Sequence, residues 1–180
     1  MNSVRDSRMH RSESIAKLAR ALVAELLAAG MTLSTAESCT GGWVAKAITD
    51  IPGSSGCFAY GIVSYSNEAK QALLRVDPAT IREHGAVSEF TVREMARGAL
   101  AVSGADLAVA ISGVAGPGGG SADKPVGTVW FCFGWRMSGE TRVEAVLHRL
   151  EGDREAVRRQ SVMLALDGVR DRLARIKAND

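Results

Sequence analysis

Two short segments of the chain hold the residues that are best suited to catalysis. Residues 35–42, with the sequence TAESCTGG, place the hydroxyl of Ser38 shortly before a pair of glycines. Residues 65–70, with the sequence YSNEAK, supply Tyr65 and Lys70. If these segments meet in one cleft, acyl transfer is possible: the serine attacks, a neutral lysine takes its proton, and the tyrosine relays or orients that proton.

Each of these residues also has a purely structural interpretation. Ser38 or Thr40 can be the N-cap of a following helix. Tyr65 can be a packed residue at the rim of the protein, and Lys70 can lie on a solvated face, where most lysines are found. An unperturbed lysine, with a pKa of about 10.4, is almost wholly protonated at neutral pH. A catalytic Lys70 therefore requires a pKa lowered by burial or by positive neighbours, or a reaction that runs mainly at alkaline pH.

The thiol of Cys39 competes with Ser38 for the role of nucleophile, since a thiol is intrinsically the more reactive group. A cysteine nucleophile usually has a histidine as its base, whereas a lysine suits a hydroxyl. The histidines are scattered far from both segments, at positions 10, 84 and 148. We therefore predict that Ser38 is the nucleophile.

A third segment, residues 112–120, has the sequence SGVAGPGGG, with five glycines between positions 113 and 120. It resembles an anion-binding nest of backbone N–H groups. It contains neither the Gly-Lys-Ser/Thr end of a P-loop nor the G-x-G-x-x-G fingerprint, so neither nucleoside-triphosphate hydrolysis nor dinucleotide redox chemistry is indicated. The alternative is a glycine-rich turn between two strands.

Small residues let a substrate approach the backbone closely, and free N–H groups at the start of a helix can hold a phosphate or an oxyanion. We therefore assign substrate binding to residues of the first and third segments. These are Cys39, Thr40, Gly41, Gly42, Ser112, Gly113, Gly116, Gly118 and Gly119.

Hydrophobic periodicity predicts alternating helices and strands that position these segments. Helices are expected from residue 15 to a stop at Gly30, at 40–51, 67–75 and 89–102, and from Asp153 onward, and strands at 31–35, 58–65, 106–112, 126–134 and 141–149. Asp77-Pro78 is expected to form a turn. The pattern predicts an α/β protein, a three-layer α/β/α sandwich with a mixed, mainly parallel sheet of about five strands. Such sheets bind ligands beyond the carboxyl ends of their strands, where the three segments lie.

Composition narrows the class of protein further. The chain has 180 residues with 46% hydrophobic and 23% charged residues, typical of a folded protein. A net charge of +2 does not indicate a nucleic-acid partner. Three widely spaced cysteines suit reduced thiols in the cytoplasm, and without a Cys/His cluster neither a metal nor a cofactor is expected. Apolar runs are too short to span a membrane. Residues 1–11 are expected to be a disordered extension and 12–180 a single domain.

Several motifs, in order along the chain, resemble the C-terminal domain of the competence/damage-inducible protein CinA. The resemblance covers residues 15–173. Its motifs are TAESCTGG at 35–42, PGSS at 52–55, YSNEAK at 65–70, GAVS at 85–88, GPGGG at 116–120 and KPVGTV at 124–129.

The resemblance implies a nicotinamide-nucleotide amidase, which hydrolyses nicotinamide mononucleotide to nicotinate mononucleotide and ammonia in pyridine-nucleotide recycling. It implies the same three-layer fold and a homo-oligomer, either a dimer or a tetramer. The family's serine, tyrosine and lysine fall on Ser38, Tyr65 and Lys70, and its glycine loop falls on residues 113–120. We expect the helix-start N–H groups of residues 39–42 to stabilise the oxyanion.

A non-catalytic nucleotide-binding module related to CinA is the alternative function. Such a module would hold a nucleotide in the same glycine-rich cleft and signal its presence to a partner without turnover. It does not require Ser38, Tyr65 and Lys70 together, whereas an amidase does.

Overall fold

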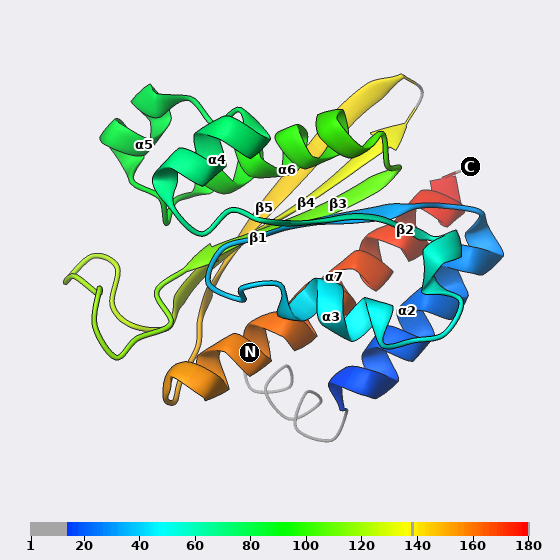
Figure 1. The fold of residues 1–180 in the computed structure, drawn as a ribbon, viewed down its shortest axis with the longest axis horizontal. Coiled ribbons are helices and arrows are strands. Elements are labelled where there is room, and N and C mark those ends of the chain that lie inside the picture. The colour runs from blue at the N-terminus through cyan, green and yellow to red at the C-terminus, as the bar shows by residue number, and fades with distance from the viewer. Residues whose placement is uncertain (1–13, 138, 180) are drawn as a thin grey trace.

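The computed structural model describes residues 14–137 and 139–179, and the extension expected at residues 1–11 lies outside them. At its centre is one five-stranded sheet with helices on both faces (Figure 1). The strands, in order across the sheet, are β2 (Phe58–Val63), β1 (Leu33–Glu37), β3 (Leu107–Gly113), β4 (Thr128–Met137) and β5 (Glu140–Arg149). The predicted fold class and the mixed sheet are confirmed.

Strand β1 pairs in parallel with both of its neighbours, β2 and β3. Strand β4 runs antiparallel to β3, and β5 runs antiparallel to β4. The three parallel strands therefore end at the same edge of the sheet. A short 3-10 turn, η1 (Ser54–Gly56), leads into β2.

Two groups of helices cover the sheet. One face carries α2 (Ile15–Ala29), α3 (Trp43–Thr49) and α7 (Arg154–Asn179), and the other carries α4 (Asn67–Leu74), α5 (Pro78–His84) and α6 (Glu89–Ser103) (Figure 1). No helix within the described ranges is long and apolar enough to cross a membrane.

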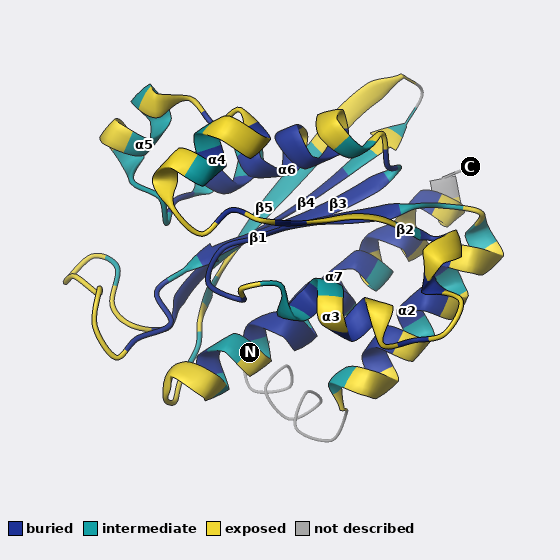
Figure 2. Cartoon of the chain, in the orientation of Figure 1, coloured by how far each residue is buried: buried dark blue, intermediate teal, exposed yellow. Residues whose placement is uncertain are grey.

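Side chains of the inner strands alternate between two buried cores, because successive residues of a strand point to opposite faces. In β3, Leu107, Val109 and Ile111 join the core with α2, α3 and α7, whereas Ala108 and Ala110 join the core with α6. Both faces of these strands are buried (Figure 2). A nearly continuous apolar run is therefore what a central strand requires.

The same alternation separates two neighbouring polar residues at the end of β1. Leu33 belongs to the core with α3, and Ala36 belongs to the core with α6. By parity, Glu37 points to the α3 face and Ser38 points to the face that carries α4. The side chains of Glu37 and Ser38 therefore lie on opposite faces of the sheet.

The start of α3 differs from the prediction. A helix was expected from residue 40, but α3 begins at Trp43. Gly41 and Gly42 have φ values of +62° and +90°, in the left-handed region that glycine adopts without strain. This glycine pair forms a turn between β1 and α3. Strand β1 likewise lies later than expected, at Leu33–Glu37 instead of 31–35, where its partners β2 and β3 set its limits.

The predicted turn at Asp77-Pro78 is instead the start of a helix, α5. Asp77 is the N-cap, and its carboxylate accepts a hydrogen bond of 2.7 Å from the N–H of Ala79. Proline is favoured at the first helical position, where its missing N–H is not needed. The same dipeptide therefore serves a turn or a helix start, and the packing of α5 against α6 selects the helix.

Candidate active site

A cavity of about 230 Å³ opens at the carboxyl ends of the parallel strands. All three segments that the sequence analysis singled out contribute to its wall. The lining residues are Ser38, Cys39, Tyr65, Asn67, Lys70, Ala86, Val87, Ser112, Gly113, Ala115 and Arg154. The topology therefore brings together segments that are separated by up to about 75 residues of sequence, as expected for the strand ends of an open α/β sheet.

Ser38 and Lys70 are in direct contact at the base of this cavity. Lys70 Nζ lies 3.0 Å from Ser38 Oγ. Ser38 follows β1 directly, and its N–H donates to the carbonyl of Ile111 in β3, which fixes its backbone to the sheet. Lys70 lies in the first turn of α4, whose N-cap Ser66 accepts a hydrogen bond from Ala69.

The amine of Lys70 is held by oxygen atoms alone. It donates to the carbonyls of Ser64 at 2.8 Å and Tyr65 at 3.3 Å, in addition to its contact with Ser38. Only 1% of its surface is exposed, and no acidic residue that the structure describes forms an ion pair with it. Burial therefore lowers the pKa of Lys70, with a smaller opposing effect of the neighbouring Cys39.

This arrangement suits a neutral lysine that acts as a base. A neutral amine has two N–H groups and one lone pair. Carbonyl oxygens only accept hydrogen bonds, so those of Ser64 and Tyr65 take the two N–H groups. The lone pair is then left for Ser38, whose hydroxyl donates to it. In this state the lysine is oriented to remove the serine proton.

Cys39, the rival nucleophile, is held in its inactive form. Burial raises the pKa of its thiol to about 11, and the negative charge of Glu37 adds to this effect. The thiolate is the reactive form of cysteine, so a thiol with this pKa is inert near neutral pH. The geometry and the pKa both favour Ser38.

Glu37 stabilises the turn that carries Ser38. Its buried carboxylate accepts hydrogen bonds from the first N–H groups of α3 and from the hydroxyl of Thr35 at 3.2 Å. The N–H donors are Gly42 at 3.0 Å, Val44 at 3.1 Å and Ala45 at 2.8 Å. Each hydrogen bond to a charged group contributes about 1.5–3 kcal/mol. The N–H of Gly42, which was predicted to meet the substrate, is therefore occupied by Glu37.

Tyr65 and Arg154 form the mouth of the cavity. The guanidinium of Arg154 donates to the phenolic oxygen of Tyr65 at 3.1 Å and to the carbonyl of Gly116 at 2.6 Å. The side chain of Tyr65 is 60% exposed, and its backbone carbonyl, not its phenol, contacts Lys70. A guanidinium has five N–H donors, so Arg154 keeps donors for an anionic ligand.

Arg158, one helical turn after Arg154, holds the other side of the nucleophile turn. Its guanidinium donates to the carbonyl of Cys39 at 3.1 Å and to that of Thr40 at 3.0 Å, and it lies 5.5 Å from the centre of the Trp43 ring. Neither arginine was predicted from the sequence as part of the site. Their spacing of four places them on one face of α7, but nothing in the sequence indicates that this face meets the active-site segments.

The glycine-rich segment contributes only its beginning to the cavity. Ser112 and Gly113 line the wall, and the hydroxyl of Ser112 donates to the carbonyl of Ala86 at 2.7 Å. Gly118 and Gly119 are exposed on a loop that extends away from the sheet (Figure 1). A Cβ atom at either glycine would meet no other atom within 4 Å.

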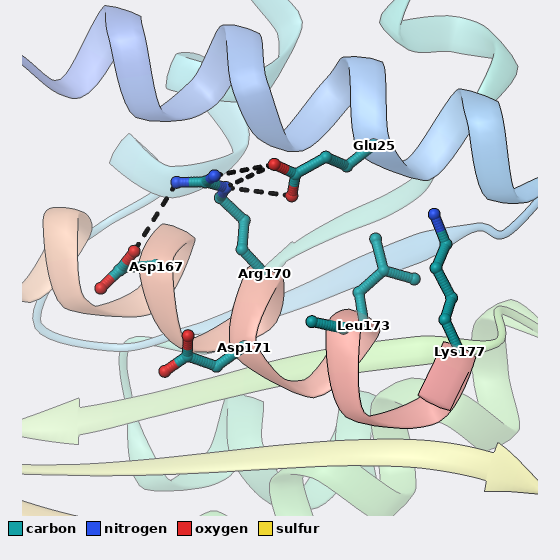
Figure 3. Close-up of a pocket in the computed structure, with 7 residues that line it drawn as sticks. Glu25, Asp167, Arg170, Asp171, Leu173 and Lys177 are labelled. Atoms are coloured by element: carbon teal, nitrogen blue, oxygen red, sulfur yellow. Dashed lines mark hydrogen bonds and ion pairs between the residues drawn. The ribbon is translucent and has the colours of Figure 1, made fainter. Parts of the chain in front are cut away.

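Another cavity, of about 250 Å³, lies between α2 and α7 and has no comparable chemistry (Figure 3). Arg170 crosses it and forms ion pairs with Glu25 at 2.7 Å and Asp167 at 3.7 Å. Three of its charged side chains thus pair with one another, and its lining contains no serine, cysteine or histidine. We therefore place the candidate active site at Ser38.

Comparison with known proteins identifies the family. Residues 15–173 match the model of the CinA C-terminal domain. The chain belongs to this family. The nicotinamide-nucleotide amidohydrolase PncC of Escherichia coli K12 is 59% identical over 142 residues, which cover 78% of this chain and 84% of the relative. A CinA-like protein of Chlorobaculum tepidum is 52% identical over 149 residues, which are 82% of this chain but 35% of that longer protein.

Solved structures of the CinA superfamily share the fold. A member from Klebsiella pneumoniae superposes with a TM-score of 0.85 at 41% identity, covering 91% of this chain and 99% of its own. A competence/damage-inducible protein from Agrobacterium tumefaciens gives a TM-score of 0.80 at 42% identity, covering 86% and 93%. The CinA fold is therefore shared over nearly the whole length of this chain.

The state of Lys70 can be tested through the reactivity of Ser38. A fluorophosphonate should label Ser38 at a rate that rises with pH, with a midpoint below the ordinary lysine pKa of 10.5, because burial lowers the pKa at which Lys70 loses its proton. Lys70→Arg should react at least about tenfold more slowly at every pH, since arginine stays charged. Labelling is followed by intact-protein mass spectrometry. Lys46→Arg, on the exposed face of α3, is the matched control. If the Lys70→Arg variant still shows the same pH-dependent labelling, Lys70 is not the base.

Proposed function

We propose that this protein is a nicotinamide-nucleotide amidase that hydrolyses nicotinamide mononucleotide to nicotinate mononucleotide and ammonia in pyridine-nucleotide recycling. The observation that carries the proposal is the buried amine of Lys70, 3.0 Å from Ser38 Oγ within a cavity. The relationship to a protein named nicotinamide-nucleotide amidohydrolase, at 59% identity, supports the choice of substrate.

In the first half of the reaction, Ser38 attacks the carboxamide. A bond forms between Ser38 Oγ and the amide carbon while the serine proton passes to Lys70 Nζ, and the C=O electron pair moves onto the oxygen. The C–N bond then breaks, Lys70 returns the proton to the leaving nitrogen, and ammonia departs. The acyl group remains as an ester of Ser38.

Water completes the reaction by the same route. The neutral amine of Lys70 takes a proton from water as the oxygen of the water bonds to the ester carbon. The bond between that carbon and Ser38 Oγ then breaks, and Lys70 returns the proton to the serine. Nicotinate mononucleotide is released, and the enzyme regains its starting state without a metal or cofactor.

Tyr65 and Arg154 are proposed to bind and orient the nucleotide. Apart from Lys70, Arg154 is the one cationic side chain in the described lining of the cavity, and it is exposed at the mouth. A guanidinium matches the geometry of a phosphate. Its hydrogen bond to Gly116 places this cation beside the glycine-rich loop, which we propose as the second part of the phosphate site.

Assembly and cellular location are further parts of the proposal. We infer a homo-oligomer, because the edge strand β2 has the sequence FAYGIV without a charge and is largely exposed, with Tyr60 at 49% and Val63 at 45%. The opposite edge, β5, carries charges that discourage pairing with another chain. Free, buried thiols at Cys39, Cys57 and Cys132 suit the reducing cytoplasm.

Release of ammonia from nicotinamide mononucleotide tests the activity directly. Ser38→Ala should lose at least about a thousandfold in kcat, since the nucleophile is gone. Cys39→Ala should stay within about threefold of the wild type, because its buried thiol is inert. Ammonia is measured by a coupled glutamate dehydrogenase assay. The reverse ranking would make Cys39 the nucleophile. Tight nucleotide binding without ammonia release would favour the binding module.

The phosphate role of Arg154 predicts a substrate-dependent defect. Arg154→Gln should lower kcat/KM for nicotinamide mononucleotide by roughly ten- to a hundredfold, the equivalent of about 1.5–3 kcal/mol for a hydrogen bond to a charged group. It should affect nicotinamide riboside, which has no phosphate, by less than about threefold. Arg159→Gln, at an exposed neighbouring position, is the control. An equal loss on both substrates would show that Arg154 shapes the site without reading the phosphate.

The oligomer predicts a mass change on substitution at the edge of the sheet. Tyr60→Lys should shift the mass measured by light scattering toward the monomer, because a buried interface would then contain unpaired charges. Thr141→Lys, on the charged edge β5, should leave the mass unchanged. A wild-type protein that is monomeric at micromolar concentration would contradict the proposal.

A further inference from the structure

The backbone N–H groups around Ser38 are nearly all accounted for. Those at the start of α3 donate to the Glu37 carboxylate, and the N–H of Gly41 donates to the carbonyl of Ser38 at 3.0 Å. The N–H groups of Cys39 and Thr40 donate to no other residue in the described ranges, and the N–H of Cys39 contacts only the sulfur of its own side chain. Buried backbone donors are rarely left unpaired, so this pair is available for a ligand.

Arg158 fixes the orientation of the peptide groups in this turn. Its two hydrogen bonds hold the carbonyls of Cys39 and Thr40 toward α7. In a trans peptide the N–H points opposite to the C=O, so the N–H of Thr40 points away from Arg158. Cys39 lies in the cavity wall next to Ser38. The two free donors therefore belong to the peptide units that directly follow the nucleophile.

We propose that the N–H groups of Cys39 and Thr40 form the oxyanion-binding site for Ser38, and that Arg158 is the positioning residue that orients the N–H of Thr40 through the carbonyl of Cys39. This inference rests on the proposed amidase function. As Ser38 Oγ bonds to the amide carbon, the carbonyl oxygen gains a negative charge that these two donors stabilise. The site binds the negatively charged oxygen of the tetrahedral intermediate in preference to the carbonyl oxygen of the substrate.

Arg158 also strengthens the donor that it orients. Its positively charged guanidinium binds the carbonyl oxygen of the Cys39–Thr40 peptide, which polarises that peptide and makes its N–H a better donor. The guanidinium is held in place by its two hydrogen bonds to the turn and by its contact with the Trp43 ring. Lysine offers a point charge without the fork that spans two carbonyls, so it replaces only part of this role.

The kinetic test compares Arg158→Gln with Arg159→Gln, an exposed neighbour on the same helix. Loss of one oxyanion donor typically costs roughly 10²–10³-fold in kcat, so a weakened site should cost at least about tenfold. The KM for nicotinamide mononucleotide and the Kd for nicotinate mononucleotide should change by less than about twofold, because neither ground state carries the oxyanion. Arg158→Lys should fall between the wild type and Arg158→Gln, and Arg159→Gln should match the wild type.

A tetrahedral mimic gives an independent measurement. Pyridine-3-boronic acid should form a boronate adduct with Ser38, with one boron-bound oxygen in the oxyanion site. Its Ki should rise in Arg158→Gln by about the same factor by which kcat/KM falls, as expected for a transition-state analogue. Ki should stay unchanged in Arg159→Gln. Ki is the dissociation constant of the boronate, measured by calorimetry without turnover, so this arm tests the site even if the natural substrate is a different amide.

Several results would overturn the assignment. A kcat in Arg158→Gln equal to that of Arg159→Gln would show that Arg158 does not position the donors. A parallel loss of affinity for nicotinate mononucleotide would make Arg158 a general shaping residue of the cavity. If thermal unfolding shows that Arg158→Gln does not fold, Arg158→Lys decides by the same criteria. A wild type that releases no ammonia refutes the amidase proposal alone, whereas an unchanged boronate Ki in Arg158→Gln refutes the oxyanion site.

Discussion

Burial of the Lys70 amine beside Ser38, without a carboxylate partner, is the interaction on which the active site depends. An interior that excludes water disfavours every charged form, and it acts on two neighbouring groups at once. It lowers the pKa of Lys70, which makes the neutral amine easier to form, and it raises the pKa of Cys39, so the thiol keeps its proton. One physical effect therefore favours the neutral form of the proposed base and the protonated form of the competing thiol. A carboxylate next to Lys70 would reverse the first of these effects and leave a charged lysine that cannot accept a proton.

The sheet makes this burial possible. Parallel strands β1, β2 and β3 end together, so that the residues after each strand face one cavity. Within β1, alternation sends Glu37 to the α3 face and the following residue, Ser38, to the α4 face. Glu37 can then bind the N–H groups at the start of α3 while Ser38 meets Lys70. The two-residue period of a strand thus separates two consecutive residues: Glu37 holds the turn, and Ser38, the proposed nucleophile, faces Lys70.

The first turns of α7 complete the site from the other end of the chain. Arg154 connects the Tyr65 segment with the glycine-rich segment, and Arg158 holds the carbonyls of the nucleophile turn. Guanidinium groups suit this task because one planar fork can bind two acceptors. The last helix of this CinA-family domain is therefore more than a cover for the sheet, since it joins all three segments that carry the candidate chemistry.

Local sequence determined much of this protein. Apolar periodicity was sufficient for the α/β class and the order of elements, and glycines at 30 and 104 ended helices as predicted, because a left-handed C-cap is a local property. Ser38, Lys70 and Tyr65 were identified from residue type and motif resemblance. Tertiary structure alone decided the rest. The exact ends of β1, the helix at Asp77-Pro78, and the placement of Arg154 and Arg158 depend on partners far away in sequence. So does the lowered pKa of Lys70, because only the folded chain removes water from a lysine that lies in a polar segment of the sequence.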